Sequence, residues 1–263
     1  MQFSGSHYKI VLFGAGNVAT HLGKRLQKKG HEVLQVISKS EDSAKELAVQ
    51  LSASFTTDLK QVNPNANIYL FCVPDEEIVT LASRLKLPGK LVLHTSGSIR
   101  LNVLKNVSSN CGVLYPLYSF SKQVKVSFSS MPLLVEASNK DALQELMHLA
   151  HSIGKEVAQV NSDQRAKIHL AAVFVNNFTN FMFSEAYEYL KNEKQNHFHL
   201  LQPLIKQTVK KIKTMPPAQV QTGPARRNDN TTIKKHLELL ENYPDQKQIY
   251  KLLTTLIKKQ YNG

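Results

Sequence analysis

The sequence predicts an α/β domain with a doubly wound, mostly parallel sheet, followed by an all-helical domain. Up to about residue 160, short apolar runs typical of buried strands alternate with stretches of helical periodicity. After Asn161 the strand-like runs stop, and apolar residues recur at helical spacing over 163–191 and beyond. In this chain of 263 residues we therefore expect one domain over residues 1–160 and a second over 161–263.

Each expected element follows from a local signal. The strand at 68–73, for example, ends at Pro74-Asp75, because proline and a helix N-cap residue both favour a boundary there. Apolar runs predict strands at 10–13, 31–37, 68–73, 90–95, 112–115, 132–136 and 155–160. Helical periodicity predicts helices at 43–51, 76–85, 141–153, 163–191, 198–213, 230–241 and 245–260, with a Pro/Gly-rich interruption at 215–227.

A glycine motif joins the first strand to the first helix. Its residues are Gly14-Ala15-Gly16-Asn17-Val18-Ala19, which fit the pattern Gly-x-Gly-x-x-Ala. The first glycine permits a tight turn, the second lets the backbone approach a pyrophosphate, and the small residue lets the helix pack on the strand. The motif predicts a dinucleotide site in a Rossmann-type domain, and the alternative is a glycine-rich turn that binds no cofactor.

The end of the second strand indicates which dinucleotide binds. A carboxylate that would hold the 2′-hydroxyl of NAD is missing there, and Ser38, Lys39 and Ser40 follow instead. Hydroxyls and an ammonium suit a 2′-phosphate, whereas Glu41 and Asp42 suit the start of the next helix. We therefore predict an NADP(H) site, with an ordinary polar loop as the alternative.

Two further strand ends should border the cofactor, because ligands of open α/β sheets bind at the carboxyl ends of strands. The residues expected to contact the cofactor there are Cys72, Val73, Pro74, His94, Thr95, Ser96 and Gly97. Ser98, Tyr118 and Ser119 are candidates for binding the substrate. Turn formation explains the Ser and Gly residues equally well, and core packing explains the aromatic ones.

The long helix expected at 163–191 carries the candidate catalytic residues. His169 is the first candidate for a proton donor, since hydride transfer needs a group that polarises or protonates the acceptor. Asn176 or Asn177 would orient His169, and Asn180 is a further candidate for binding the substrate. All three fall on or near the helical face of His169, among Ala171, Ala172, Phe174 and Phe178, which we expect to be buried. Interhelical hydrogen bonds or an exposed edge are the alternative.

Two cations are further candidates. Lys167 is the second candidate for the catalytic group. Arg227 lies in the loop before the helix at 230–241, where its guanidinium would suit a substrate carboxylate or phosphate. Pairing of Arg227 with Asp229, or with a neighbouring subunit, is the alternative.

The composition narrows the possible functions. The net charge is +13, which suits an anionic cofactor and substrate, and the scattered lysines show none of the patterns of nucleic-acid-binding domains. Cys72 and Cys111 lie in apolar runs, so we expect buried thiols and neither a disulfide nor a metal site. Apolar runs fall short of the roughly 18 residues of a membrane span, and the first strand leaves no room for a signal peptide. We expect a soluble, cytoplasmic protein.

The chain resembles a family of two-domain NADP oxidoreductases. The resemblance covers nearly the whole chain and depends on the segments 14–17, 94–98, 115–120, 169–174, 177–180 and 222–227, with Asp229 and His236. The family is similar to 6-phosphogluconate dehydrogenase, ketopantoate reductase and pyrroline-5-carboxylate reductase. The resemblance implies a Rossmann domain, NADP(H), and a helical domain that closes over the nicotinamide and forms a homodimer.

The expected function is that of an NADPH-dependent oxidoreductase. It would transfer hydride to a C=O or C=N group of a small, anionic substrate, such as a ketopantoate-like 2-keto acid or a cyclic imine acid. Hydroxyacid dehydrogenases of the superfamily pair a helix lysine with an asparagine four residues later. In this chain Ala171 stands four residues after Lys167, which counts against a hydroxyacid dehydrogenase. The alternative function is that of a sensor or scaffold protein that binds NADP without turnover.

Overall fold

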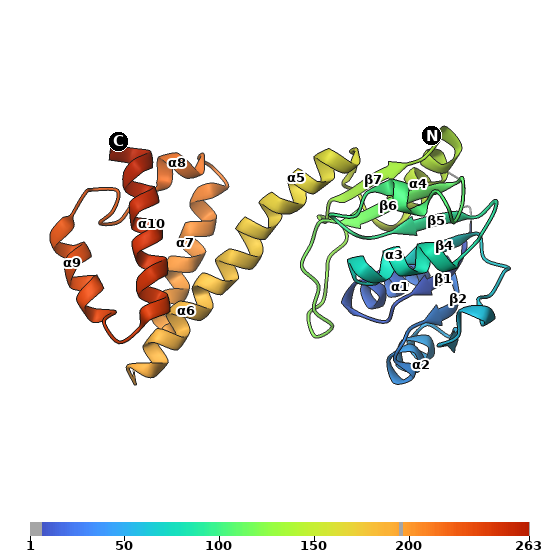
Figure 1. The fold of residues 1–263 in the computed structure, drawn as a ribbon, viewed down its shortest axis with the longest axis horizontal. Coiled ribbons are helices and arrows are strands. Elements are labelled where there is room, and N and C mark those ends of the chain that lie inside the picture. Colours follow the sequence, from blue (N-terminus) through green and yellow to red (C-terminus); the bar gives the residue numbers. More distant parts are fainter. Residues whose placement is uncertain (1–6, 195–196, 263) are drawn as a thin grey trace. The chain divides into compact units, whose positions relative to one another are not determined.

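The computed structural model describes residues 7–194 and 197–262. Contacts within the chain group it into two compact units, residues 1–177 and residues 178–263 (Figure 1). Helix α5 (Ser162–Ala172) begins where the strands end and is grouped with the sheet. The predicted boundary between a cofactor-binding domain over residues 1–160 and a second domain over residues 161–263 stays a prediction.

The first unit contains a mostly parallel sheet, which confirms the predicted fold class. Within the described residues the sheet has eight strands in the order β3-β2-β1-β4-β5-β6-β7-β8. Neighbouring strands pair in parallel except β6 with β7, which pair antiparallel. The strands are β1 (Lys9–Phe13), β2 (Glu32–Ile37), β3 (Ser54–Thr56), β4 (Ile68–Phe71), β5 (Leu91–His94), β6 (Cys111–Pro116), β7 (Leu133–Ala137) and β8 (Val157–Gln159).

Alternating side chains of the strands build a core on each face of this sheet. In β1, Ile10 and Leu12 pack with α1, α2 and α4, whereas Val11 and Phe13 pack with α3 on the other face. The helices are α1 (Asn17–Lys28), α2 (Glu41–Gln50), α3 (Asp75–Arg84) and α4 (Lys140–Ile153), and short 3₁₀ turns lie at Leu59–Gln61 and Leu101–Leu104. The doubly wound arrangement is therefore confirmed.

Three local features differ from the expectation. The three-residue strand β3 has too short a pattern to be recognised, and two of its side chains are exposed. Asp75 is the first residue of α3 and not its N-cap, and its carboxylate accepts a hydrogen bond from the Ser98 hydroxyl. The helix expected at 163–191 contains a π-helical segment, Val173–Phe178, between α5 and α6 (Thr179–Asn192).

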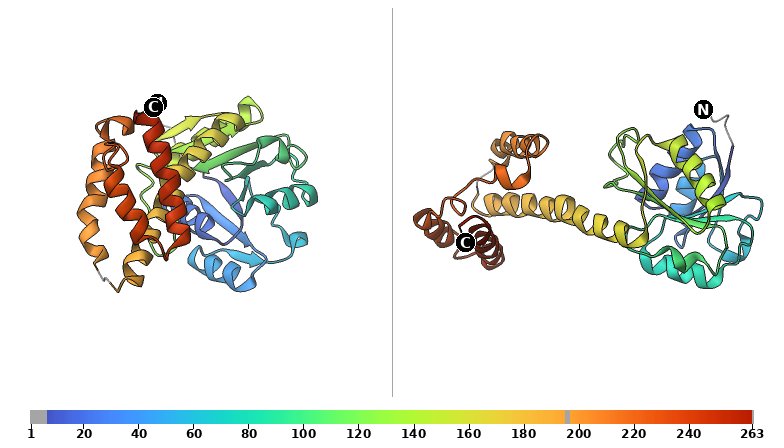
Figure 2. Two further views of the ribbon diagram at one scale, coloured as in Figure 1. Left: turned by 60° about the vertical axis from the view of Figure 1, so that its left-hand side comes forward. Right: turned by 90° about the horizontal axis from the view of Figure 1, so that it is seen from above.

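The second unit is helical. Besides α6 it contains α7 (Gln202–Ile212), α8 (Pro217–Val220), α9 (Asn230–Leu239), α10 (Pro244–Asn262) and a 3₁₀ turn at Phe198–Leu201. Helices α9 and α10 run side by side (Figure 2), and Nδ1 of His236 lies 2.8 Å from the hydroxyl of Tyr250. Asp229 caps α9 by accepting from the backbone N–H of Thr232. The expected helical second half is confirmed.

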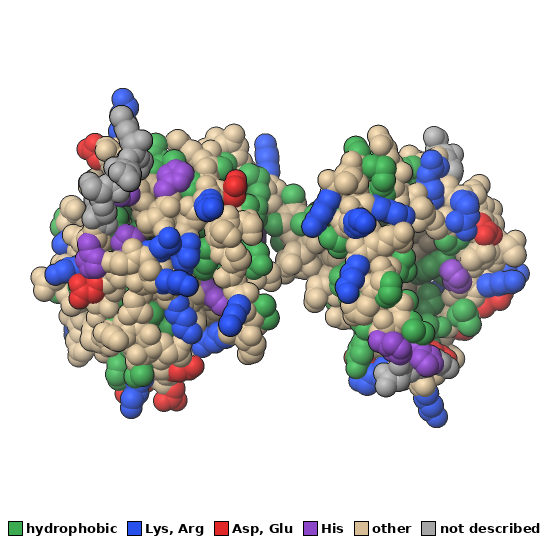
Figure 3. Space-filling model, turned by 180° about the vertical axis from the view of Figure 1, so that it is seen from behind, with side chains coloured by type: hydrophobic (Ala, Val, Ile, Leu, Met, Phe, Trp, Pro, Cys, Tyr) green, Lys and Arg blue, Asp and Glu red, His purple; other side chains and the backbone are tan. Residues whose placement is uncertain are grey.

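The surface is basic and partly apolar. Lys and Arg side chains are spread over the visible face, with hydrophobic side chains exposed among them (Figure 3). Searched over its described residues, the chain has no helix that is long and apolar enough to cross a membrane. The same part of the chain holds no group of three or more His, Cys, Asp or Glu residues placed to bind a metal ion.

Candidate active site

A cavity of about 510 Å³ lies at the carboxyl ends of β1, β2 and β4. The order β2-β1-β4 makes this edge the point where successive strands run outward in opposite directions, which is where open α/β sheets bind ligands. The residues that line the cavity are Phe13, Gly14, Ala15, Gly16, Ile37, Ser38, Lys39, Thr57, Leu59, Cys72, Val73, Pro74, Glu76, Glu77, Leu81 and Arg84.

The two motif glycines have different structural roles. Gly14 has φ +105°, and a Cβ atom there would lie 2.2 Å from the carbonyl oxygen of Cys72, so only glycine fits this turn. A Cβ atom at Gly16 would meet no atom of the described residues within 4 Å. Gly16 is the N-cap of α1, and no described side chain caps this helix end. Open space before free backbone N–H groups fits the pyrophosphate of a dinucleotide.

The residues after β2 divide into two groups. Ser38 and Lys39 line the cavity, and the Lys39 ammonium pairs with the Glu77 carboxylate of α3. Ser40 lies outside the lining, and its hydroxyl caps α2 by accepting from the backbone N–H of Ser43. Arg84, at the end of α3, adds a second cation to the cavity. Sequence reasoning missed Arg84, because its position at a helix end gave no signal of its own.

Three other predicted contacts lie along the cavity wall, and two point elsewhere. Cys72, Val73 and Pro74 line the cavity, and burial raises the pKa of the Cys72 thiol to about 12, so this thiol stays protonated. The side-chain amide of Asn17 donates to the carbonyl of Phe120, at 3.0 Å. Val18 packs against the hydrophobic core. The cofactor contacts expected of Asn17 and Val18 stay predictions.

Most polar side chains at and after the end of β5 form hydrogen bonds within the protein. His94 is fully buried, its Nδ1 accepts from the backbone N–H of Ser96, and burial lowers the pKa of its imidazole to about 3. The Thr95 hydroxyl donates to Phe71, and the Ser96 hydroxyl oxygen accepts from the backbone N–H groups of Ser98 and Ile99. The His94 side chain is closed to a cofactor, so it acts in the fold of this turn.

Helix α5 places His169 at the carboxyl ends of β5 and β6. A Cβ atom at Gly97 would lie 2.6 Å from both Cγ and Nδ1 of His169, so the imidazole rests on the Gly97 backbone. Nδ1 of His169 lies 2.9 Å from the Tyr115 hydroxyl, and the two rings meet edge to face at 5.8 Å between centroids. Sequence reasoning missed Tyr115, although the end of a central strand, where it lies, was a usable signal.

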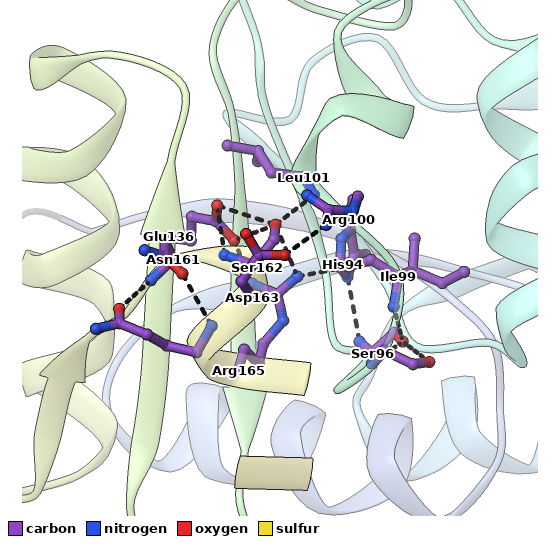
Figure 4. A network of polar contacts seen from close by, with 12 residues as sticks. His94, Ser96, Ile99, Arg100, Leu101, Glu136, Asn161, Ser162, Asp163 and Arg165 are labelled. Carbon is purple, nitrogen blue, oxygen red and sulfur yellow. Dashed lines mark hydrogen bonds and ion pairs between the residues drawn. The ribbon is translucent and has the colours of Figure 1, made fainter. Parts of the chain in front are cut away.

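A buried ion pair fixes the start of α5 (Figure 4). Arg165 is 1% exposed, and its guanidinium pairs with Glu136 and donates to the carbonyl of Ile99. The Ser162 hydroxyl donates to the same carboxylate at 2.8 Å. Asn161 caps the helix in a reciprocal capping box. Because Arg165 precedes His169 by about one turn, these contacts fix the position of His169.

The other predicted residues of this helix are exposed. Lys167 is exposed, and two residues of α-helix turn it about 200° away from His169. Asn176 and Asn177 are exposed in the π-helical segment, whose wider turn changes the α-helical spacing on which the predicted polar face depended, and Asn180 is exposed on α6. The expected burial is wrong for Ala171, Phe174 and Phe178, since Ala171 is exposed and the two phenylalanines are 59% and 50% exposed, and Ala172 is only half-buried. The buried face at this level of the helix was assigned from α-helical spacing, which the π-helix breaks.

The candidate substrate residues are more dispersed. The Ser98 hydroxyl donates to the Asp75 carboxylate, and its oxygen lies 3.3 Å from the Ser96 hydroxyl. Tyr118 is 50% exposed and contacts the ring of Phe120, and Ser119 is exposed. Arg227 is exposed in the second unit, next to the α9 cap. Their roles as substrate ligands stay predictions.

Comparison with known proteins gives the family. Residues 9–97 match the family described as NADP oxidoreductase, coenzyme F420-dependent, and residues 131–257 match a domain of unknown function. A protein from Bacteroides fragilis, assigned as an NADP oxidoreductase, is 40% identical over 96% of this chain and 98% of its own, with a TM-score of 0.90. The chain belongs to this family of NADP oxidoreductases. The predicted family, enzyme class and NADP(H) cofactor are thereby confirmed.

More distant structures share the fold of this oxidoreductase. A protein from Thermotoga maritima is 20% identical over 96% of this chain and 98% of its own, with a TM-score of 0.71. A reductive aminase from Aspergillus terreus, in complex with NADPH and ethyl-5-oxohexanoate, is 12% identical over 97% of this chain and 93% of its own, with a TM-score of 0.70. A comparison with curated proteins gave no match.

Proposed function

We propose that this oxidoreductase uses NADPH to reduce a C=O or C=N group of a small, anionic substrate, with His169 as the hydrogen-bond or proton donor. The observation that carries the proposal is the position of the His169 imidazole between Gly97 and Tyr115. An imidazole held between a glycine backbone and a tyrosine hydroxyl, at the carboxyl ends of two central strands, is suited to meet a reacting group.

The cavity at the carboxyl ends of β1, β2 and β4 supports the NADPH part of the proposal. The backbone around Gly14 and Gly16 would hold the pyrophosphate, and Ser38, Lys39 and Arg84 would hold the 2′-phosphate. NADPH, when bound, supplies the hydride that the carbon atom of the substrate receives. His169 would donate to the oxygen or nitrogen atom of that group, where negative charge develops.

The choice between C=O and C=N depends on substrate chemistry. The reductive aminase that shares this fold favours a C=N group, by analogy of fold alone. A cyclic imine acid and a ketopantoate-like 2-keto acid remain the two model substrates. Both carry a carboxylate, which the basic balance of the chain would attract.

A homodimer through the helical part of the chain belongs to the same proposal. The helix that runs from α5 through the π-helical segment into α6 exposes large apolar side chains, which a second copy would cover. These side chains are Leu170, Phe174, Val175, Phe178 and Phe181. Sedimentation of the wild type and of Val175→Lys tests this part: a dimer that the substitution dissociates supports it, and a monomeric wild type contradicts it.

Turnover by a His169 variant tests the proposed function. The purified protein is incubated with NADPH and a panel of 2-keto acids and cyclic imines, and loss of nicotinamide absorbance is followed. We expect His169→Ala to lower kcat at least about 100-fold while the Kd for NADPH is unchanged. His236→Ala, which removes a histidine bonded to a tyrosine in the second unit, is the matched control. NADPH binding with no turnover on any substrate would favour the sensor or scaffold function instead.

A further inference from the structure

The hydrogen bond between Tyr115 and His169 has two possible directions. A phenol carries one proton, and a neutral imidazole carries one proton on either Nδ1 or Nε2. Either the phenol donates to Nδ1 and leaves the proton on Nε2, or Nδ1–H donates to the phenol oxygen. The two arrangements present opposite chemistry at Nε2, a donor in the first case and an acceptor in the second.

The surroundings of Tyr115 favour the first direction. Tyr115 is half-buried at the end of β6, and among the described residues its hydroxyl has a hydrogen-bond partner only in Nδ1 of His169. If Nδ1–H donated, the phenol O–H of Tyr115 would need another acceptor, which the described residues do not supply. The first direction satisfies this O–H within the protein, whereas the second leaves it to solvent, and one such intramolecular hydrogen bond contributes about 0.5–1.5 kcal/mol. Burial also raises the pKa of Tyr115, so the phenol keeps its proton.

We propose that Tyr115 is a positioning residue that donates to Nδ1 of His169 and so presents Nε2–H to the substrate. The inference rests on the proposed role of His169 as donor and adds the group that fixes its tautomer. Gly97 contributes to this arrangement, because the absence of a Cβ atom lets the imidazole approach the phenol. Asn176 and Asn177, predicted as neighbours of His169 on its helical face, lie about two turns farther along in the π-helical segment.

The tautomer is measurable without substrate or turnover. Full-length protein labelled with ¹⁵N in histidine gives ring-nitrogen chemical shifts that distinguish Nε2–H from Nδ1–H. The His169 signal is identified by its loss in His169→Gln. We expect Nε2–H to predominate in the wild type, and Tyr115→Phe to change the tautomer ratio about three- to ten-fold toward Nδ1–H, since one hydrogen bond is lost.

Two further variants make the test specific. Gly97→Ala should push the imidazole off the phenol with Tyr115 intact, and it should move the ratio in the same direction, so the test survives if Tyr115→Phe fails to fold. Tyr250→Phe removes the hydroxyl of the His236–Tyr250 pair and is the matched control, with no expected change at His169. A wild type with predominant Nδ1–H would overturn the inference. So would an unchanged tautomer ratio in both Tyr115→Phe and Gly97→Ala.

Kinetics then separate this inference from the proposed function. With a substrate found by the panel, Tyr115→Phe should lower kcat about ten-fold and leave the Kd for NADPH unchanged. Failure of His169→Ala to affect turnover would refute the proposed function alone. The tautomer ratio in the substrate-free protein decides the role of Tyr115 independently.

Discussion

Alanine substitutions at the two motif glycines should have different effects, one on the stability of the fold and the other on cofactor binding. Gly14→Ala places an L-residue at φ +105° with its Cβ 2.2 Å from the Cys72 carbonyl oxygen and 2.9 Å from the carbonyl carbon. The unfavourable φ costs about 1–3 kcal/mol, and displacing the backbone of β4's end adds about 1–3 kcal/mol as overpacking. We expect Gly14→Ala to lower the free energy of unfolding by about 2–6 kcal/mol.

Gly16→Ala should have the opposite profile. Its Cβ would enter space that no described residue occupies, and the helix cap loses only about 0.5 kcal/mol. The methyl group would stand where the pyrophosphate approaches, so one or two charge-assisted hydrogen bonds would be lost and the Kd for NADPH would rise about 10- to 100-fold.

Urea unfolding and NADPH titration of both variants form the assay. Gly14→Ala should shift the urea midpoint strongly, and Gly16→Ala should leave it nearly unchanged while weakening NADPH binding. A Gly16→Ala protein that binds NADPH as tightly as the wild type would refute the assignment of the pyrophosphate to this helix end. An unshifted midpoint in Gly14→Ala would refute the role of Gly14 in the turn.

Three other outcomes follow from the described contacts. Lys39→Ala should raise the Kd for NADPH about ten-fold and leave NADH binding unchanged in parallel titrations, because only NADPH carries a 2′-phosphate. Arg165→Met should lower the free energy of unfolding by about 3 kcal/mol in urea, because it leaves Glu136 without its partner. Burial lowers the pKa of His94 to about 3, so the unfolded chain binds the proton first, and stability should fall by about 1.4 kcal/mol per pH unit from pH 6.5 toward 3. Unfolding curves of His94→Gln across this range should show a smaller slope.

The parts of the fold that sequence predicts well have strong local signals. The buried run of β1 followed by Gly14 and Gly16 specifies strand, turn and helix together, so consistent signals at several levels identify the Rossmann-type half. The antiparallel pairing of β7 with β6 depends on contacts between segments far apart in the chain, which no local pattern encodes. The π-helical segment departs from the α-helical period that sequence reasoning assumes, and it misplaces Phe174 and Phe178.

The candidate site shows the same division. His169 could be singled out as a polar residue in an apolar helix, and the cofactor glycines by their motif. Tyr115 and Arg84 come from other elements, so only the folded chain brings Tyr115 to His169 and Arg84 to the cavity. The position of Ser40 in the sequence suits both a phosphate contact and a helix cap, and in the structure Ser40 caps α2. Side chains with two local uses are therefore the hardest to assign from sequence.

Titration of the full-length protein with NADPH and with NADH, followed by nicotinamide fluorescence, tests the central claim most directly. The cavity with Lys39 and Arg84 predicts micromolar binding of NADPH and binding of NADH at least about ten-fold weaker. Equal binding of the two would contradict the 2′-phosphate site, and binding of neither would contradict the proposed reductase.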